Sequence, residues 1–217
     1  MLERVGHFIH ERIRRRGESD GFAAAWPRID SVQGWLSRGE AELLFETALG
    51  RHGATIVEIG SYLGRSTSAL ALAAIQNGGR VAAIDPHTGD RSEVEFEGRN
   101  DVTTEAGFRA NMTRLGLDGT VIPMVSMSTD AARDWTHGAT VDVLFVDGWH
   151  STEAVKADID AWLPHLAEDA IVLFDDWAYP DVAAGIASRT HLLPPRQGYV
   201  GKIALYASHA VDGVRLR

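Results

Sequence analysis

The chain has 217 residues, of which 45% are hydrophobic and 24% charged, as is typical of a globular protein with one full core. Its formal charge of −9 argues against a nucleic-acid partner, which usually needs a basic face, and its lack of cysteine excludes disulfides and thiolate chemistry. No apolar stretch approaches a membrane span and residues 1–16 lack the apolar core of a secretory signal, so we expect no membrane partner and a cytoplasmic location.

The first 50 residues are predicted to form a helical N-terminal cap. Apolar residues recur there at helical spacing (Leu2, Val5, Ile9 and Ile13). The run ERIRRR at 11–16 carries four arginines, which fit either a solvated helix face or a local binding patch. A second helix should begin at the capping-box pattern of Ser37 and Glu40 and end at Gly50.

From residue 54 short apolar runs alternate with helical patterns. The runs are apolar on both faces, as parallel strands covered by helices should be (55–60, 80–85, 121–126, 141–147 and 170–176). Helical stripes lie between them (Thr67 to Ile75, ended by Asn77-Gly78-Gly79, and Val155 to Leu166). This alternation predicts an α/β fold with a doubly wound, Rossmann-like sheet of about seven strands. The segment 197–208 should add a last, antiparallel strand, and we expect one domain over 1–217.

The segment 86–100 interrupts this pattern. It is polar, has no clean period and follows Asp85 at a strand end. Ligands of α/β proteins bind at the carboxyl ends of the strands, so this segment could be a lid over a ligand. A long surface loop without a role explains it equally well.

A glycine-rich turn follows the first strand in the sequence VEIGSYLGRST, with Glu58, Gly60 and Gly64 in a fixed pattern. Such a turn lets a ligand approach the backbone. A dinucleotide fingerprint requires glycine at the position of Glu58, and no Gly-Lys-Ser/Thr follows as in a P-loop. A carboxylate instead suits the ammonium and sulfonium of S-adenosylmethionine.

Asp85 ends the second strand, where an acid can accept hydrogen bonds from both ribose hydroxyls of an adenosine. Together with Glu58, Gly60 and Gly64 it indicates an adenosyl cofactor. Further contacts are expected from residues on the neighbouring turns (Ser61, Tyr62, Ser66, Ser126, Met127, Ser128 and Asp147). Met127 has the alternative of a core position, and His87 is a candidate for cofactor or substrate contact.

Two other apolar runs end in acids: VDVLFVDGWH with Asp147 and His150, and AIVLFDDW with Asp175 and Asp176. If the runs are neighbouring strands, their ends lie about 5 Å apart. Carboxylate clusters suit hard cations such as Mg²⁺. Adjacent residues of a strand point to opposite faces, so Asp175 and Asp176 can share a metal only beyond the strand's end. Asp147 has the alternative of capping the helix that starts near Ser151.

At these residues the chain resembles class I S-adenosylmethionine-dependent methyltransferases over 54–208. VDGWH with FDDW resembles the metal-dependent O-methyltransferases that methylate sugars of macrolides and mycobacterial polysaccharides. The resemblance implies that Asp147, Asp175 and Asp176 bind Mg²⁺ and that His150 is the general base. It also implies that the loop with Ser126, Met127 and Ser128 contacts adenine.

We therefore expect Mg²⁺-dependent methyl transfer to a hydroxyl of a sugar or glycoside. A catechol or other vicinal diol is an alternative acceptor, and a non-catalytic adenosine-binding module is an alternative function. Trp149 and Trp177 flank the acidic ends; they suit sugar rings or belong to the core. Residues 1–50 could cover the substrate, form a homodimer interface, or do both.

Overall fold

A computed structural model describes residues 21–88, 103–135, 140–211, 214 and 216. The expected helix over Leu2–Ile13, the basic run at 11–16 and most of the possible lid at 86–100 lie outside these residues. None of the helices within the described part of the chain is long and apolar enough to cross a membrane.

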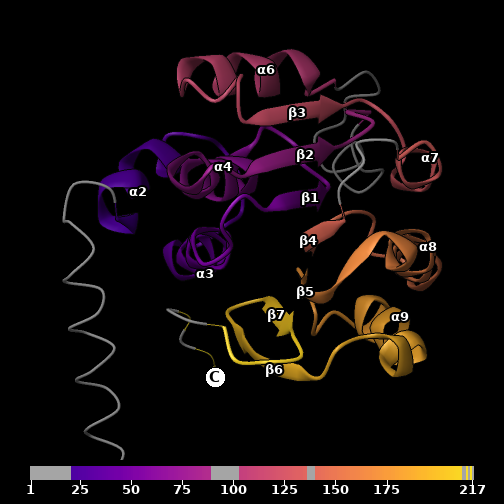
Figure 1. Ribbon diagram of the computed structural model, residues 1–217. Helices are drawn as coiled ribbons and strands as arrows, with labels where there is room; N and C mark the ends of the chain where they lie inside the picture. The colour runs from indigo at the N-terminus through magenta and orange to yellow at the C-terminus, as the bar shows by residue number, and fades with distance from the viewer. Residues whose placement is uncertain (1–20, 89–102, 136–139, 212–213, 215, 217) are drawn as a thin grey trace, which may run out of the picture.

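The described strands form one seven-stranded sheet in the order β3-β2-β1-β4-β5-β7-β6 (Figure 1). The first five strands along the sequence pair in parallel, and β7 is antiparallel to both β5 and β6. The predicted Rossmann-like α/β fold is thus confirmed. The strands are β1 (Thr55–Ile59), β2 (Arg80–Ile84), β3 (Val121–Met124), β4 (Val141–Val146), β5 (Leu166–Phe174), β6 (Arg196–Val200) and β7 (Ile203–Tyr206).

The segment after 195 contains two strands, where the sequence predicted one. Gly201, at φ 55°, makes the tight turn that joins β6 to β7. The first of the two strands begins at Arg196 and occupies the edge of the sheet. The resulting hairpin places Lys202 beside the carboxyl end of β5.

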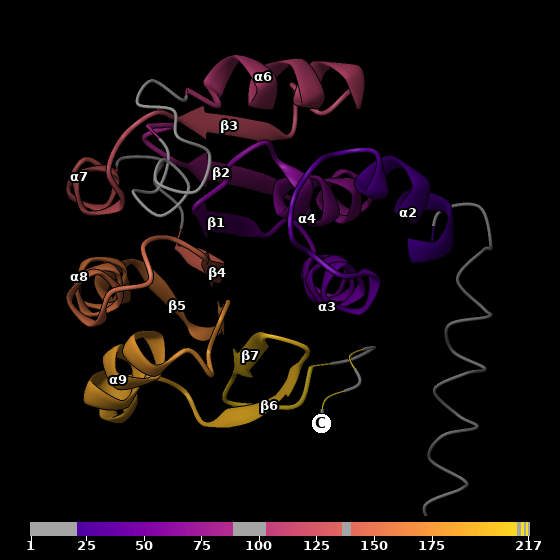
Figure 2. The ribbon, with the colours of Figure 1, turned by 180° about the vertical axis from the view of Figure 1, so that it is seen from behind.

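Helices cover both faces of the sheet (Figures 1 and 2). One core cluster joins α2, α3, α4 and α6 to one face, and a second joins α7, α8 and α9 to the other. These layers bury the two-sided apolar strands that the sequence shows. The helices are α2 (Phe22–Asp30), α3 (Arg38–Leu49), α4 (Arg65–Asn77), α6 (Glu105–Arg114), α7 (Ser128–Arg133), α8 (Thr152–Trp162) and α9 (Pro180–Arg189), with short 3₁₀ turns η1 (Leu163–His165) and η2 (Thr190–Leu192).

Helix ends follow the capping signals. Ser37 and Glu40 form the predicted capping box at the start of α3, and Gly78, in a left-handed conformation, ends α4. The helix α8 stops at Trp162, four residues before the predicted end. Pro164 supports a 3₁₀ turn there, and Leu166 already belongs to β5.

The carboxyl ends of four strands lie in register at one edge of the sheet. Ile59 pairs with Ile84 and with Val146, and Val146 pairs with Phe174. The residues that follow these partners are Gly60, Asp85, Asp147 and Asp175. The expected convergence of the acidic strand ends is therefore present.

Candidate active site

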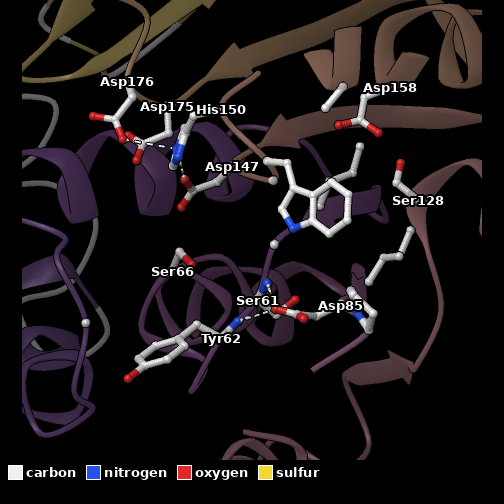
Figure 3. Close-up of a pocket in the computed structure, with 18 of the residues that line it drawn as sticks. Ser61, Tyr62, Ser66, Asp85, Ser128, Asp147, His150, Asp158, Asp175 and Asp176 are labelled. Atoms are coloured by element: carbon white, nitrogen blue, oxygen red, sulfur yellow. Dashed lines mark hydrogen bonds and ion pairs between the residues drawn. The ribbon is translucent and has the colours of Figure 1, made fainter. Parts of the chain in front are cut away.

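A cavity of about 700 Å³ opens at this edge of the sheet. The turns after β1, β2, β4 and β5 contribute to its wall, as do the loop at 33–36, the start of α7, α8 and Lys202. Figure 3 shows Asp147, His150 and Asp176 on one side of it, with Ser61, Tyr62 and Asp85 below them. This is where α/β proteins bind ligands.

The glycine-rich turn packs directly against the end of β4. Gly60 has φ 86°, and a Cβ built on it would lie 1.9 Å from the carbonyl oxygen of Asp147. Gly64, at φ 92°, starts α4, and its Cβ would lie 2.5 Å from the Met112 side chain. Both positions therefore need glycine for conformation and for space.

Asp85 organises the turn through backbone hydrogen bonds. Its carboxylate accepts from the N–H groups of Ser61 at 2.9 Å and Tyr62 at 2.7 Å, and from the N–H of His87 at 2.6 Å. A carboxylate has about four lone-pair sites, so one site remains for a ligand hydroxyl. The cavity wall includes Asp85, which is consistent with the predicted ribose contact.

Glu58 lies beneath the turn, fully buried and outside the cavity wall. Burial raises the pKa of Glu58 to about 7, although the nearby hydroxyls of Ser66, Thr67 and Ser61 oppose the rise. The Thr67 hydroxyl donates directly to its carboxylate. Glu58 therefore acts on a ligand only through the residues above it or by its charge.

Asp147, His150 and Asp176 bring one ligand atom each to within 4.8 Å of one another. The His150 Nε2 atom lies 3.2 Å from a carboxylate oxygen of Asp176 and 3.9 Å from one of Asp147. A hydrogen bond from His150 lowers the pKa of Asp176. Burial, reinforced by the neighbouring charge of Asp175, raises the pKa of Asp147 well above its usual value.

Asp175 faces a different partner. Strand β5 ends at Phe174, so both acids lie beyond the strand, and Asp176 adopts φ 46°. The buried Asp175 carboxylate contacts the ammonium of Lys202. Burial disfavours the charge on Lys202, but attraction to Asp175 and Asp147 outweighs this and raises the pKa of Lys202 to about 12.

The helix-capping alternative for Asp147 does not hold. Ser151 is the N-cap of α8, and its hydroxyl accepts a hydrogen bond from the N–H of Ala154 at 3.2 Å. Asp147 therefore does not cap α8, and it lines the cavity.

The other predicted site residues divide into two groups. Ser66, Met127 and Trp149 line the cavity, the last with half of its surface exposed. His87 does not line the cavity: it is buried, and its Nδ1 lies 2.8 Å from the Thr104 hydroxyl. Trp177 also lies outside the wall, where Arg196 stacks on its ring at 3.9 Å. Gly64 and Ser126 are likewise absent from the wall.

The sequence did not indicate several residues of the wall. Arg65 donates to the backbone oxygens of Leu36 at 3.0 Å and Val32 at 2.8 Å, and so anchors the loop at 33–36 over the cavity. That loop carries Trp35, whose ring lies 5.2 Å from the Tyr62 ring. Asp158 and Lys202 also line the cavity. Trp35, Asp158 and Lys202 carry no local motif, because they reach the site from elements distant along the chain.

The strand order and the antiparallel β7 define the Rossmann-like methyltransferase fold, with a ligand cavity at its expected edge. Residues 57–177 match the family model described as a methyltransferase domain. The match covers more than half of the chain, and the protein belongs to this family. The expectation of a methyltransferase is thereby confirmed.

Several solved structures share the fold at low sequence identity. The O-methyltransferase TomG from Streptomyces achromogenes, in complex with SAM, is 19% identical, with a TM-score of 0.59 over 89% of this chain and 91% of that chain. An O-methyltransferase from Bacillus cereus in complex with SAH is 16% identical, with a TM-score of 0.60 over 95% and 100%. CalS11, a TDP-rhamnose 3′-O-methyltransferase of calicheamicin biosynthesis, is 16% identical, with a TM-score of 0.56 over 78% of each chain.

Proposed function

We propose that the protein transfers a methyl group from S-adenosylmethionine to a hydroxyl of a saccharide or glycoside, assisted by a divalent cation such as Mg²⁺. The observation that carries this proposal is the meeting of Asp147, His150 and Asp176 in the same cavity as the Gly60 turn. A donor site and an acceptor-activating site then lie side by side.

The donor end has the groups that an adenosyl ligand requires. Gly60 permits close approach to the backbone, and Asp85 retains an acceptor site for a ribose hydroxyl. The carboxylate of Asp85 supplies negative charge near a cationic sulfonium and ammonium. The TomG and Bacillus cereus structures contain SAM and SAH, respectively.

His150 is suited to remove the acceptor proton. In the reaction, the hydroxyl oxygen bonds to the methyl carbon as the carbon–sulfur bond breaks, and the hydroxyl proton passes to the imidazole. The neighbouring carboxylate of Asp176, 3.2 Å from Nε2, would stabilise the resulting imidazolium. A sugar hydroxyl is a much weaker acid than an imidazolium, so His150 needs further help.

The acidic cluster fits a hard cation. Carboxylate oxygens are the preferred ligands of Mg²⁺, and Asp147 and Asp176 supply them within 4.8 Å. Such a cation stabilises an alkoxide when it is bound. Asp175 would have to leave its ion pair with Lys202 to become a ligand. A single imidazole nitrogen of His150 cannot bind a cation and accept a proton at the same time. If His150 is the base, Asp147 and Asp176 must therefore hold the cation without it.

Two observations favour a saccharide as the acceptor. Trp149 and Trp35 present exposed aromatic faces at the cavity, and flat faces of this kind suit sugar rings. CalS11, which shares the fold, is described as acting on TDP-rhamnose.

Methyl-transfer assays on glycoside acceptors, with and without EDTA, would test the function. We expect Asp147→Asn to abolish turnover and Mn²⁺ binding but to retain S-adenosylhomocysteine binding. His150→Ala should lower kcat by about 10²–10⁴-fold and keep Mn²⁺. Asp134→Asn, which changes an exposed acid, provides the control. Turnover that is insensitive to EDTA and to Asp147→Asn would contradict the metal, and an unchanged kcat in His150→Ala would contradict the base.

A further inference from the structure

Lys202 is a cationic residue of the cavity wall that neither the proton transfer nor the cation site proposed above uses. Its ammonium contacts the Asp175 carboxylate and lies 3.8 Å from a carboxylate oxygen of Asp176. Figure 3 shows Asp175 and Asp176 beside His150, with Asp147 close to them, at one end of the cavity. The lysine charge therefore lies among the acids that would surround a bound cation.

The backbone of Lys202 is fixed by residues from two other parts of the chain. Its N–H donates to the Glu40 carboxylate, which is 5% exposed and also accepts from the Ser37 N–H at 2.7 Å in the capping box of α3. A Cβ built on Gly201 would overlap the Glu40 carboxylate, so the turn packs directly on this acid. The Trp177 N–H donates to the carbonyl of Lys202 at 3.2 Å. The lysine side chain therefore extends into the acidic cluster from an anchored turn.

Asp175 depends on this ammonium as its counter-charge. Its carboxylate is 2% exposed, and a buried carboxylate is strongly unfavourable unless a charged or hydrogen-bonding partner compensates it. A cation that used Asp175 as a ligand would have to displace the ammonium or lie against it. Lys202 and a divalent cation thus compete for the same carboxylate, whereas Asp147 and Asp176 remain available as ligands.

The ammonium is also close enough to repel a cation that Asp176 holds. A divalent cation lies about 2.1 Å from its oxygen ligands, so on the Asp176 oxygen nearest Lys202 it would be within about 6 Å of the ammonium. Even at the dielectric constant of water, about 80, the repulsion between the two charges at that distance corresponds to about a tenfold loss of affinity. Burial of the cluster increases the effect.

We propose that Lys202 is a positioning residue that holds the Asp175 carboxylate away from the cation and thereby limits the affinity of the site for divalent cations. The inference rests on the cation site proposed above and extends it, because it explains how many acids bind the ion. One ammonium and the carboxylates of Asp147, Asp175 and Asp176 leave a net charge of −2 (1 − 3), which a single divalent cation balances. Mg²⁺ takes about six oxygen ligands, so two carboxylates leave positions open for water and the acceptor.

Titration with Mn²⁺, followed by the electron paramagnetic resonance signal of the free ion at pH 8 and low ionic strength, tests this assignment. We expect Lys202→Met to bind Mn²⁺ about tenfold or more tightly than the wild type, and Lys202→Arg, which keeps the charge, to bind it like the wild type. Asp175→Asn should bind more weakly, because an acid is lost and the ammonium is free to approach Asp176. The double variant Lys202→Met/Asp175→Asn loses one charge of each sign and should return close to the wild-type affinity.

Lys156→Met is the matched control, since it removes the same charge from a surface pair with Glu153. An affinity of a folded Lys202→Met no higher than that of the wild type would overturn the inference and leave the cation site intact. A double variant as weak as Asp175→Asn would also overturn it, because Asp175 would then itself be a ligand. A wild type that binds no Mn²⁺ would overturn the proposed cation and this inference together.

Circular dichroism establishes whether each variant is folded. If Lys202→Met is unfolded, the comparison of the double variant with Asp175→Asn decides, because neither protein contains the buried acid without its partner. Tighter Mn²⁺ binding by the double variant supports the inference, and equal binding overturns it.

Discussion

The ammonium of Lys202 forms an ion pair with the carboxylate of Asp175 inside the acidic end of the cavity. The same ammonium lies 3.8 Å from a carboxylate oxygen of Asp176. Lys202 is held from both sides, because its N–H donates to Glu40 at 2.8 Å and its carbonyl accepts from the Trp177 N–H at 3.2 Å. The hairpin turn thus supplies a fixed positive charge among the carboxylates.

Replacing Lys202 should show how much its ion pair with the buried Asp175 stabilises the fold. We expect Lys202→Met to lower the free energy of unfolding by about 1–3 kcal/mol, because the buried Asp175 carboxylate loses its charged partner. Adding Asp175→Asn should restore much of this loss, as the double-mutant cycle would show. Urea denaturation at neutral pH gives the measurement.

The chain offers a matched control, since Lys156 is its only other lysine. Lys156 pairs with Glu153 on the surface of α8, and such pairs contribute about 0–1 kcal/mol. Lys156→Met should therefore leave the unfolding curve almost unchanged. If Lys202→Met changed the free energy of unfolding equally little, the ion pair with Asp175 would not contribute to stability.

The buried Glu58 should make stability depend on pH. Its folded pKa of about 7 lies above its usual 4.5, so the stability associated with its bound proton is fully present below about pH 4.5 and is lost as the pH rises through 7. We expect Glu58→Gln to be more stable than the wild type at pH 8 by up to about 3 kcal/mol, and to lose this advantage near pH 4.5. Melting curves across pH would test this. The exposed Glu42→Gln serves as the control, and parallel wild-type and Glu58→Gln profiles would refute the shift.

The close packing of Gly60 on β4 predicts a severe effect of one methyl group. Gly60→Ala places a Cβ 1.9 Å from the Asp147 oxygen, so it should displace the end of β4 and abolish S-adenosylhomocysteine binding. Gly53→Ala isolates the strain of positive φ, because Gly53 has φ 67° and no neighbour within 4 Å. That variant should lose roughly 1–2 kcal/mol and keep the ligand. Similar binding by both variants would show that the contact with Asp147 is unimportant.

Asp85 should control cofactor affinity. One carboxylate oxygen of Asp85 accepts from Ser61 and Tyr62 and the other from His87, so in Asp85→Asn the amide NH₂ replaces an acceptor and leaves at least one of these N–H groups unpaired. We expect S-adenosylhomocysteine affinity to fall by about tenfold or more. Asp118→Asn, a surface acid bonded to Thr113, should have no effect on Kd. An unchanged Kd in Asp85→Asn would remove Asp85 from the ribose site.

Local sequence patterns determined the framework of this protein. The two-sided apolar runs predicted the parallel strands, and the Ser37 capping box and Gly78 marked helix ends, because side-chain periodicity and capping act within a few residues. The acids Asp85 and Asp147 could be placed at one edge, since parallel strands end on the same side of the sheet. Two local features were not predicted from the sequence: the hairpin at Gly201 and the early end of α8.

Only the tertiary structure decided which charges meet. The sequence grouped Asp175 with a metal, whereas the fold brings Lys202 to it from a hairpin 27 residues further along (202 − 175). It also brings Glu40 of α3 against the same hairpin. No local propensity specifies such contacts, because they depend on how segments distant in the chain pack across the sheet.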